Sequence, residues 1–275
     1  MSRASLADVK ERLDAVLAGS AGRGAASAAA ARQLGDELFA VTGLLDDEAR
    51  LRRILSDPSR AAAARQSLVR ELLRGKISAP ALELVTALAG ESWSEPADLP
   101  DAAEQLAVLA VVEAAGRQGV LDDVEDELFR FGRVVNAEPQ LRIALSDPFI
   151  QADRKNTLLQ ALLGGKVTDP TMRLVSQAAD HPRGRSLDVN LEEYARLAAE
   201  RRERLVAEVH VAIALTAEQR ERLRTALVTS YGRDVHLNIV LDPRVIGGIS
   251  VQIADEIIDG TMAGRLAGLR RRMAA

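Results

Sequence analysis

The sequence predicts a mainly α-helical protein that ends in a small α+β domain. Apolar residues recur at helical spacing over the first two thirds of the chain, and a sustained strand-like alternation begins only after residue 205. Aromatic residues make up 3% of the chain and apolar residues 47%, so aliphatic side chains must fill the cores, which favours helices. We expect two tandem helical bundles, followed by a domain with the order strand-helix-strand-strand-strand-helix.

The chain length predicts more than one domain, because 275 residues exceed the usual size of a single one. We expect a first bundle at 1–90, a linker at 91–100, a second bundle at 101–205 and an α/β domain at 206–275. The linker is placed where proline, serine and acidic residues gather. Trp93 within it should pack onto a bundle as an apolar staple.

The two predicted bundles are copies of one module. When the chain is shifted by 90 positions, DELF at Asp36–Phe39 aligns with DELF at Asp126–Phe129 without a gap. In the same way, LRRILSDP from Leu51 aligns with LRIALSDP from Leu141. About twenty of roughly fifty aligned positions are identical, and this degree of self-similarity indicates a duplication.

Each copy has the pattern of several short helices. One stripe per copy has the spacing of a buried helix face: Leu34, Leu38, Val41 and Leu45 in copy one, and Val124, Leu128, Phe131 and Val135 in copy two. At Ser56–Pro58 a polar cap precedes a proline, so one helix should end and the next begin there. Gly75 and Gly165 should end the following helices. Pro80 and Pro170 should then open new ones.

One helix, at residues 102–117, is apolar on two opposite sides. A bundle helix normally buries a single stripe, so the second stripe here is either central to a large core or covered by a partner. The sequence leaves open which side is core. The residues concerned are Val108, Val111 and Val112 on one side, and Leu106, Leu109 and Ala110 on the other.

The remainder of the chain has strand and turn signals. A helix over 187–205 should lead into a strand in which Val209, Val211, Ile213 and Leu215 alternate. Thr216 and Gln219 have the spacing of a capping box for a helix that ends near Gly232. Further strands are expected at 235–239 and 249–253, with a hairpin arm at 257–258 and a last helix after it.

The glycine pair Gly247 and Gly248 lies between two of these strands and should allow a backbone turn at positive φ. Around it, the chain resembles the C-terminal signature of the delta subunit of bacterial F-type rotary ATP synthases, the family called oligomycin-sensitivity-conferring protein in mitochondria. The matching positions are Asp242, Ile246, Gly247, Gly248, Ile249, Val251, Asp255, Ile258, Asp259, Gly260, Thr261, Arg265 and Leu266.

The resemblance covers the chain from about Asp101 to its end and implies a six-helix bundle followed by a small α/β domain. Residues before about 100 are an addition, and a duplicated bundle resembles the long delta subunits of actinobacterial enzymes. The family usually opens its first helix with Tyr-Ala, whereas this chain has Leu106 and Ala107. Copy one has glycines where its first helix would align, so that helix should lie earlier, at about 5–18.

The resemblance also implies a function. A family member connects the catalytic alpha and beta head to the membrane-anchored b subunit and resists torque, with one copy per complex on the cytoplasmic face of the bacterial membrane. It implies that an N-terminal helix of the alpha subunit docks between the first and fifth helices of the bundle, and that the C-terminal domain holds the C-terminal region of b. On this chain the candidate alpha-subunit groove consists of Leu106, Leu109, Ala110, Val108 and Val111.

Catalytic and cofactor functions have little support in the sequence. Gly165 and Lys166 imitate part of a phosphate-binding loop, but Gln160 and Val167 replace the required glycine and hydroxyl residue. No cysteine is present, and the three histidines are scattered, so we expect no catalytic residue, cofactor or metal. The net charge of −4 argues against nucleic-acid binding. No apolar run approaches the length of a membrane span, and no signal peptide is expected. A helical-repeat scaffold of another assembly is the alternative, and a phosphate-binding enzyme comes third.

Overall fold

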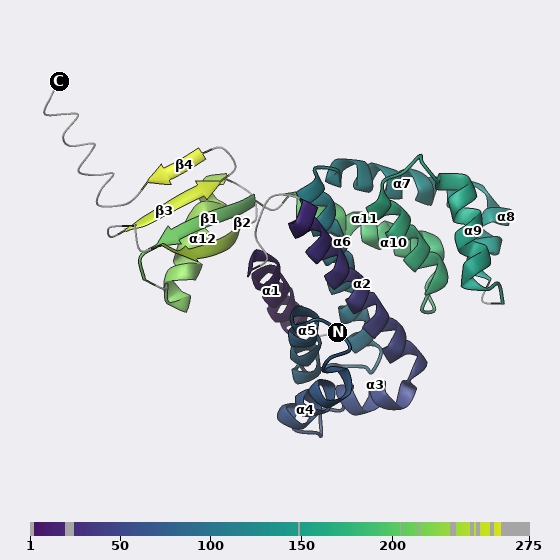
Figure 1. Cartoon of the computed structure of the whole chain (residues 1–275), viewed down its shortest axis with the longest axis horizontal. Helices are drawn as coiled ribbons and strands as arrows, with labels where there is room; N and C mark the ends of the chain where they lie inside the picture. Colours follow the sequence, from purple (N-terminus) through teal and green to yellow (C-terminus); the bar gives the residue numbers. More distant parts are fainter. Residues whose placement is uncertain are drawn as a thin grey trace, which may run out of the picture. The chain divides into compact units, whose positions relative to one another are not determined.

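The fold consists of two compact units, Met1–Arg201 and Arg202–Ala275, each of which is described by itself (Figure 1). The described part of the chain holds twelve helices and four strands, which confirms the predicted fold class. The computed structural model describes residues 3–19, 25–147, 149–203, 205–213, 215–231, 235–242, 245, 248–253 and 256–259.

The first unit is a succession of antiparallel and crossing helices (Figure 1). Its elements are α1 (Arg3–Gly19), α2 (Ala25–Asp47), α3 (Ala49–Ser56), α4 (Ala62–Leu73), α5 (Ala79–Gly90), α6 (Asp98–Gln118), α7 (Leu121–Ala137), α8 (Pro139–Ser146), α9 (Ala152–Leu163), α10 (Asp169–Asp180) and α11 (Leu187–Glu203). The first helix of copy one therefore lies where it was predicted.

The duplication is visible in the helix bounds and in the contacts. The helices α3, α4 and α5 have counterparts of equal length 90 residues further on, in α8, α9 and α10. Glu37 of α2 accepts a hydrogen bond from the Ser78 backbone N–H at 3.1 Å, at the start of α5. Glu127 of α7 accepts one from the Thr168 backbone N–H at 3.0 Å, at the start of α10. The glutamate of each DELF motif thus caps the same helix in both copies.

The helix α6 belongs to both copies. Its residues 98–113 align, 90 positions on, with residues 188–203, which are nearly all of α11, the last helix of copy two. The helix α6 is also the first helix of copy two. It packs against α1, α2 and α5 of copy one and against α7 and α10 of copy two. One hydrophobic cluster runs through both copies, from Val9 in α1 to Ala198 in α11.

This arrangement differs from the expected linker at 91–100. The connection between α5 and α6 is only 91–97, and Asp98, Leu99 and Pro100 are already buried in the first turn of α6. Trp93 is buried as predicted, and its indole N–H donates to the Leu88 carbonyl at 2.9 Å. Because α6 completes copy one and begins copy two, we propose that the two copies fold as one unit.

The turn signals of copy one are borne out with one correction. Gly75 and Gly165 adopt positive φ, and the Ser78 side chain caps α5 beside Pro80 as expected. However, α4 begins at Ala62 and not at the proline of the SDP sequence. The Asp57 side chain accepts from the Ser59 N–H at 2.9 Å, so this aspartate stabilises a separate turn before the helix. Pro148, its counterpart, lies outside the described residues.

The second unit is a four-stranded sheet covered by one helix (Figure 1). Its elements are β1 (Leu205–Val211), α12 (Ala217–Tyr231), β2 (Val235–Leu241), β3 (Ile249–Ile253) and β4 (Glu256–Asp259). The strand order is β2-β1-β3-β4, with β1 parallel to β2 and antiparallel to β3, and β3 antiparallel to β4. Alternate residues of the strands pack with α12 in one core, which includes Val209, Val251 and Leu227.

The predicted order of elements in this unit is confirmed up to β4, while the expected last helix falls outside the described residues. Thr216 and Gln219 form both hydrogen bonds of the capping box, at 2.9 and 3.2 Å. The strand β1 ends at Val211, so the expected continuation through Ile213 is wrong, and Ile213 is exposed. The reason is that β2 ends opposite Val211, which leaves no partner beyond it.

Gly248 has a backbone φ of 90°, a conformation that residues with a Cβ rarely adopt. We expect Gly248→Val to lower the stability of the second unit by about 1 to 3 kcal/mol, because valine would be strained there. Hydrogen exchange of the β1 and β3 amides measures this loss. Gln252→Val is the matched control, since it places a valine on an exposed strand position of β3. Equal protection in the two variants would contradict the backbone argument.

Candidate functional site

All five residues of the predicted alpha-subunit groove lie in the interior of the first unit. Leu106, Val108, Leu109, Ala110 and Val111 are buried, and they belong to one hydrophobic cluster. The expectation that one stripe of this helix is open to a partner is therefore wrong, and the alternative of a central core position is what the structure has. The physical reason is that helices of both copies pack against α6. The repeat could have predicted the burial of both sides of α6. A shift by 90 residues implies that copy one, like copy two, has a last helix, and that α6 is this helix.

On the side of copy one, α2 packs very closely along α6. A Cβ atom added at Gly35 would lie 2.7 Å from Val111 Cγ2 and 3.1 Å from the Ala107 carbonyl oxygen. Ala28 and Ala31 of α2 are buried in the same helix. Small residues allow two helix backbones to approach, so no room is left here for another helix.

The same helix α2 also contacts α10, the fifth helix of copy two. Arg173 Nε lies 2.6 Å from Asp36 Oδ1, and the guanidinium carbon lies 4.5 Å from the centre of the Phe39 ring. A cation over an aromatic face is attracted by the electron density of the ring. Thus α2 lies against both helices, α6 and α10, between which the resemblance places the docked alpha-subunit helix in copy two.

A buried ion cluster joins the start of α6 to the loop before α11. Glu104, with 2% of its side chain exposed, pairs with Arg183 at 3.0 Å, with Arg185, and with the Tyr194 hydroxyl at 2.6 Å. Arg183 also lies 2.8 Å from Asp46 Oδ2 at the end of α2. Burial and the adjacent Glu104 carboxylate raise the pKa of Tyr194 well above its ordinary value, so the hydroxyl stays protonated and donates. These groups hold the two copies together, and sequence reasoning did not identify them.

A second cluster lies near the other end of α6. Arg201 of α11 pairs with Asp14 of α1 and, at 2.7 Å, with Glu113 of α6, while Arg117 pairs with Glu113 at 3.0 Å. Burial acts to raise the pKa of Glu113, but the charges of Arg201 and Arg117 outweigh it and lower that pKa. The three helices α1, α6 and α11 are therefore linked by charges at this end.

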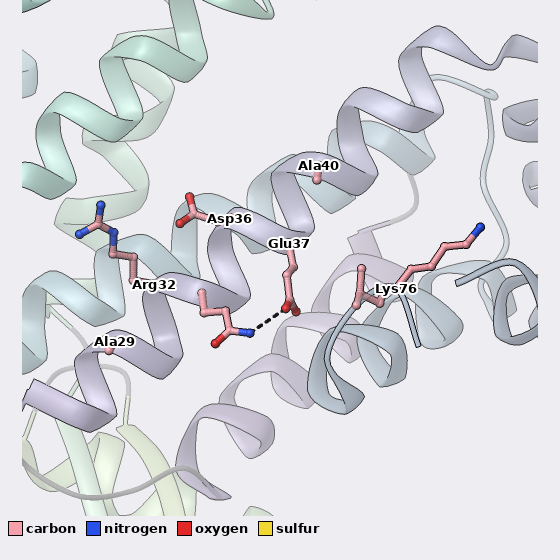
Figure 2. Close-up of a pocket in the computed structure, with 8 residues that line it drawn as sticks. Ala29, Arg32, Asp36, Glu37, Ala40 and Lys76 are labelled. Carbon is pink, nitrogen blue, oxygen red and sulfur yellow. Dashed lines mark hydrogen bonds between the residues drawn. The ribbon is translucent and has the colours of Figure 1, made fainter. Parts of the chain in front are cut away.

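An open hollow lies on α2 near these contacts (Figure 2). Figure 2 shows Asp36 and Glu37 leaving the helix in different directions. The Gln33 side-chain amide donates to Glu37 Oε1 at 2.9 Å. Glu37 also caps α5, and Asp36 pairs with Arg173. Both carboxylates of the hollow are thus already engaged in holding helices, which favours a structural role for them.

The other groups considered for chemistry also have structural surroundings. Gly165 has positive φ, and the Lys166 backbone N–H donates to the Leu163 carbonyl at 2.9 Å, as in a helix C-terminal turn. His210 Nδ1 lies 3.8 Å from Asp242 Oδ2. Over the described ranges, no three His, Cys, Asp or Glu side chains form a group that would hold a metal ion. None of the helices searched in that part of the chain is long and apolar enough to cross a membrane.

The C-terminal signature is only partly within the described residues. The Asp242 backbone N–H donates to the Val211 carbonyl at 3.0 Å, which joins the end of β2 to the end of β1. Ile249 and Val251 are in β3, Ile258 and Asp259 are in β4, and Gly248 has positive φ. The remaining positions lie outside the described residues: Ile246, Gly247, Asp255, Gly260, Thr261, Arg265 and Leu266.

Sequence reasoning missed a group of exposed apolar side chains on copy two. Phe129 and Val134 are in α7, Ile143 is in α8 and Phe149 follows α8, and all four are exposed. At three of these positions copy one has no exposed apolar side chain. Phe39, the counterpart of Phe129, is buried, and the counterparts of Ile143 and Phe149 are the polar residues Arg53 and Ser59. A comparison of the two copies position by position would have shown the two apolar replacements, at Ile143 and Phe149, although not that these side chains are exposed.

The fold and these contacts define the class of this protein. It has a duplicated helical bundle, held together by contacts between helices, and a small α/β domain. The family model for the ATP synthase delta (OSCP) subunit matches residues 103–273. The chain belongs to this family. Curated relatives match over the first copy as well, which the family model does not reach.

Two of these relatives are named ATP synthase subunit delta. The protein from Streptomyces avermitilis is 49% identical over 274 residues, which cover 100% of this chain and 98% of the relative. The protein from Thermobifida fusca is 45% identical over 274 residues, with the same two coverages. The duplicated first bundle is therefore shared with these relatives along their length.

Proposed function

We propose that this protein is a peripheral-stalk subunit of an F-type proton-translocating ATP synthase, bound at the cytoplasmic face of the bacterial membrane. It connects the catalytic alpha and beta head to the membrane-anchored b subunit, resists torque during ATP synthesis, and carries no catalytic residue of its own. The observation that carries this proposal is the full-length match to ATP synthase delta subunits.

The construction of the first unit supports a role in bearing load. A subunit that resists torque should deform little under load. Here one hydrophobic cluster continues through both copies, which limits movement between them. Buried charges add links between distant segments, such as Arg201 with Asp14. Such pairs fix the relative positions of helices even where they add little net stability.

We infer that the alpha-subunit helix docks on copy one and not on copy two. In copy two, α2 of the same chain lies against α6 and α10. The counterparts of α6 and α10 in copy one are α1 and α5, which pack against each other. Within the described residues, no helix is the equivalent there of α2 in copy two. We therefore place the alpha-subunit helix on α1 and α5, and the C-terminal region of b on the second unit.

Purification of the tagged full chain from membranes of its host tests this function. We expect the alpha, beta and b subunits to copurify, with one copy of this chain per complex. Crosslinking within that assembly should join the alpha N-terminal helix to α1 or α5 and not to α6. Recovery of a different set of partners would favour the scaffold alternative, and a chain that recovers none of these subunits would contradict the proposal.

A further inference from the structure

The two DELF motifs share two structural roles. In both copies the glutamate caps the fifth helix, as described above for Glu37 and Glu127. In both copies the leucine is fully buried in the bundle, as Leu38 and Leu128. These two positions therefore serve the fold of each copy.

The aspartate and the phenylalanine of the first motif serve the contact between the copies. Asp36 pairs with Arg173 of α10, and the same guanidinium lies over the Phe39 ring. Phe39 is 3% exposed as a result of this packing in the joint core. The chain thus contains one example of an aspartate and a phenylalanine, one turn apart, that bind a basic side chain of a packed helix.

Within the described residues of the first unit, no such helix lies over the same pair in the second motif. Phe129 is 59% exposed on α7. Asp126 pairs at 2.9 Å with Arg130 on the same helix, and both side chains are largely in solvent. An exposed ion pair one turn apart contributes little, so a partner can replace it at small cost.

We propose that the α7 face, defined by Asp126, Phe129 and Arg133, docks an amphipathic helix from another subunit of the assembly. A basic side chain of that helix would lie over Phe129 and pair with Asp126, as Arg173 does with Phe39 and Asp36. Arg130 and Arg133 stand where copy one has Ala40 and Gly43, so the docked helix should also present an acidic residue about one turn away. That the partner is a subunit of the ATP synthase rests on the proposed function, whereas the identification of the α7 face rests on the comparison of the two copies.

A second copy of this chain is the wrong occupant, for a reason of charge. A head-to-tail contact between two chains would repeat the internal one by placing α5 of one molecule on α7 of another. The counterpart of Arg173 on α5 is Glu83, which is exposed. Glu83 would oppose Asp126, and this repulsion disfavours such a chain of molecules. The partner is therefore a different protein.

Binding of the purified full chain to ATP synthase stripped of this subunit tests the inference. We expect Phe129→Ala and Asp126→Lys each to raise the Kd about tenfold or more, as loss of an interface anchor does. Phe149→Ala is the matched control, because Phe149 is 94% exposed in the same copy but lies outside the α7 face. Its affinity should stay within about twofold of the unchanged chain. Circular dichroism should be the same for all variants, since each changed side chain lies in solvent.

A photocrosslinker, benzoylphenylalanine in place of Phe129, identifies the occupant in the reassembled complex. A crosslink to a helix of another subunit that carries lysine or arginine at the site supports the inference. A crosslink to a second copy, to the second unit of the same chain or to a segment without a basic residue overturns it. Unchanged affinity of Phe129→Ala overturns it too, while failure of the unchanged chain to bind the stripped enzyme would instead contradict the proposed function.

Discussion

Glu104→Ala should destabilise the first unit by about 3 to 5 kcal/mol, the cost of leaving a buried charge without its partner. Arg183 is 7% exposed and pairs with Glu104, and Arg185 and the Tyr194 hydroxyl point at the same carboxylate. Asp46 and Asp101 also lie near Arg183 and should keep the loss toward the lower end of this range. The measurement is the free energy of unfolding in urea, followed by helical circular dichroism.

Asp126→Ala is the control for this variant, because it also removes a paired carboxylate, but on the surface of α7. Its loss should be about 0 to 1 kcal/mol. Glu104→Gln should fall between the two, since it removes the charge and keeps a hydrogen-bonding oxygen. Similar losses for Glu104→Ala and Asp126→Ala would show that the buried cluster does not hold the copies together.

The second large effect is expected at Gly35, where α2 lies close against α6. Gly35→Val should cost about 3 kcal/mol, because its side chain would occupy space that Val111 and the Ala107 carbonyl fill. The two helices would have to separate along their shared length. Since this contact joins the copies, we expect the whole first unit to lose stability in a single transition, measured by thermal unfolding.

Gly43→Val provides the matched comparison on the same helix. A Cβ at Gly43 would meet only His181 Cε1, at 3.8 Å, which is an ordinary contact. Both substitutions change glycine to valine within α2, so the effect of helix propensity is the same and cancels in the difference. If both variants unfold at the same temperature, close packing of α2 on α6 is not what the first unit depends on.

Much of the fold was predictable because its signals are local. The stripe through Leu34 and Leu38 predicts a helix face, and Thr216 with Gln219 predicts a helix start, since each depends on neighbours within a few residues. The SDP sequence misled for a related reason. Asp57 can stabilise a turn or a helix start, and the local pattern is the same for both.

The site was predicted less well, because it depends on contacts between residues far apart in the chain. The two-sided pattern of Leu106 and Val108 left open a core position or a groove covered by a partner, and both residues are buried. The sequence of α6 alone did not show which helices cover these residues. The contact of Arg173 with Asp36 joins positions 137 residues apart, so no periodicity within either helix points to it.

By itself, the sequence determined the fold class, the duplication, the order of elements up to β4 and the family, because these rest on periodicity and on matched motifs. The tertiary structure alone decided which helices cover α6, and that Phe39 is buried while Phe129 is exposed. Identical DELF motifs have identical local preferences. Their surroundings differ because copy one is followed by another copy and copy two is not, and burial is a property of those surroundings.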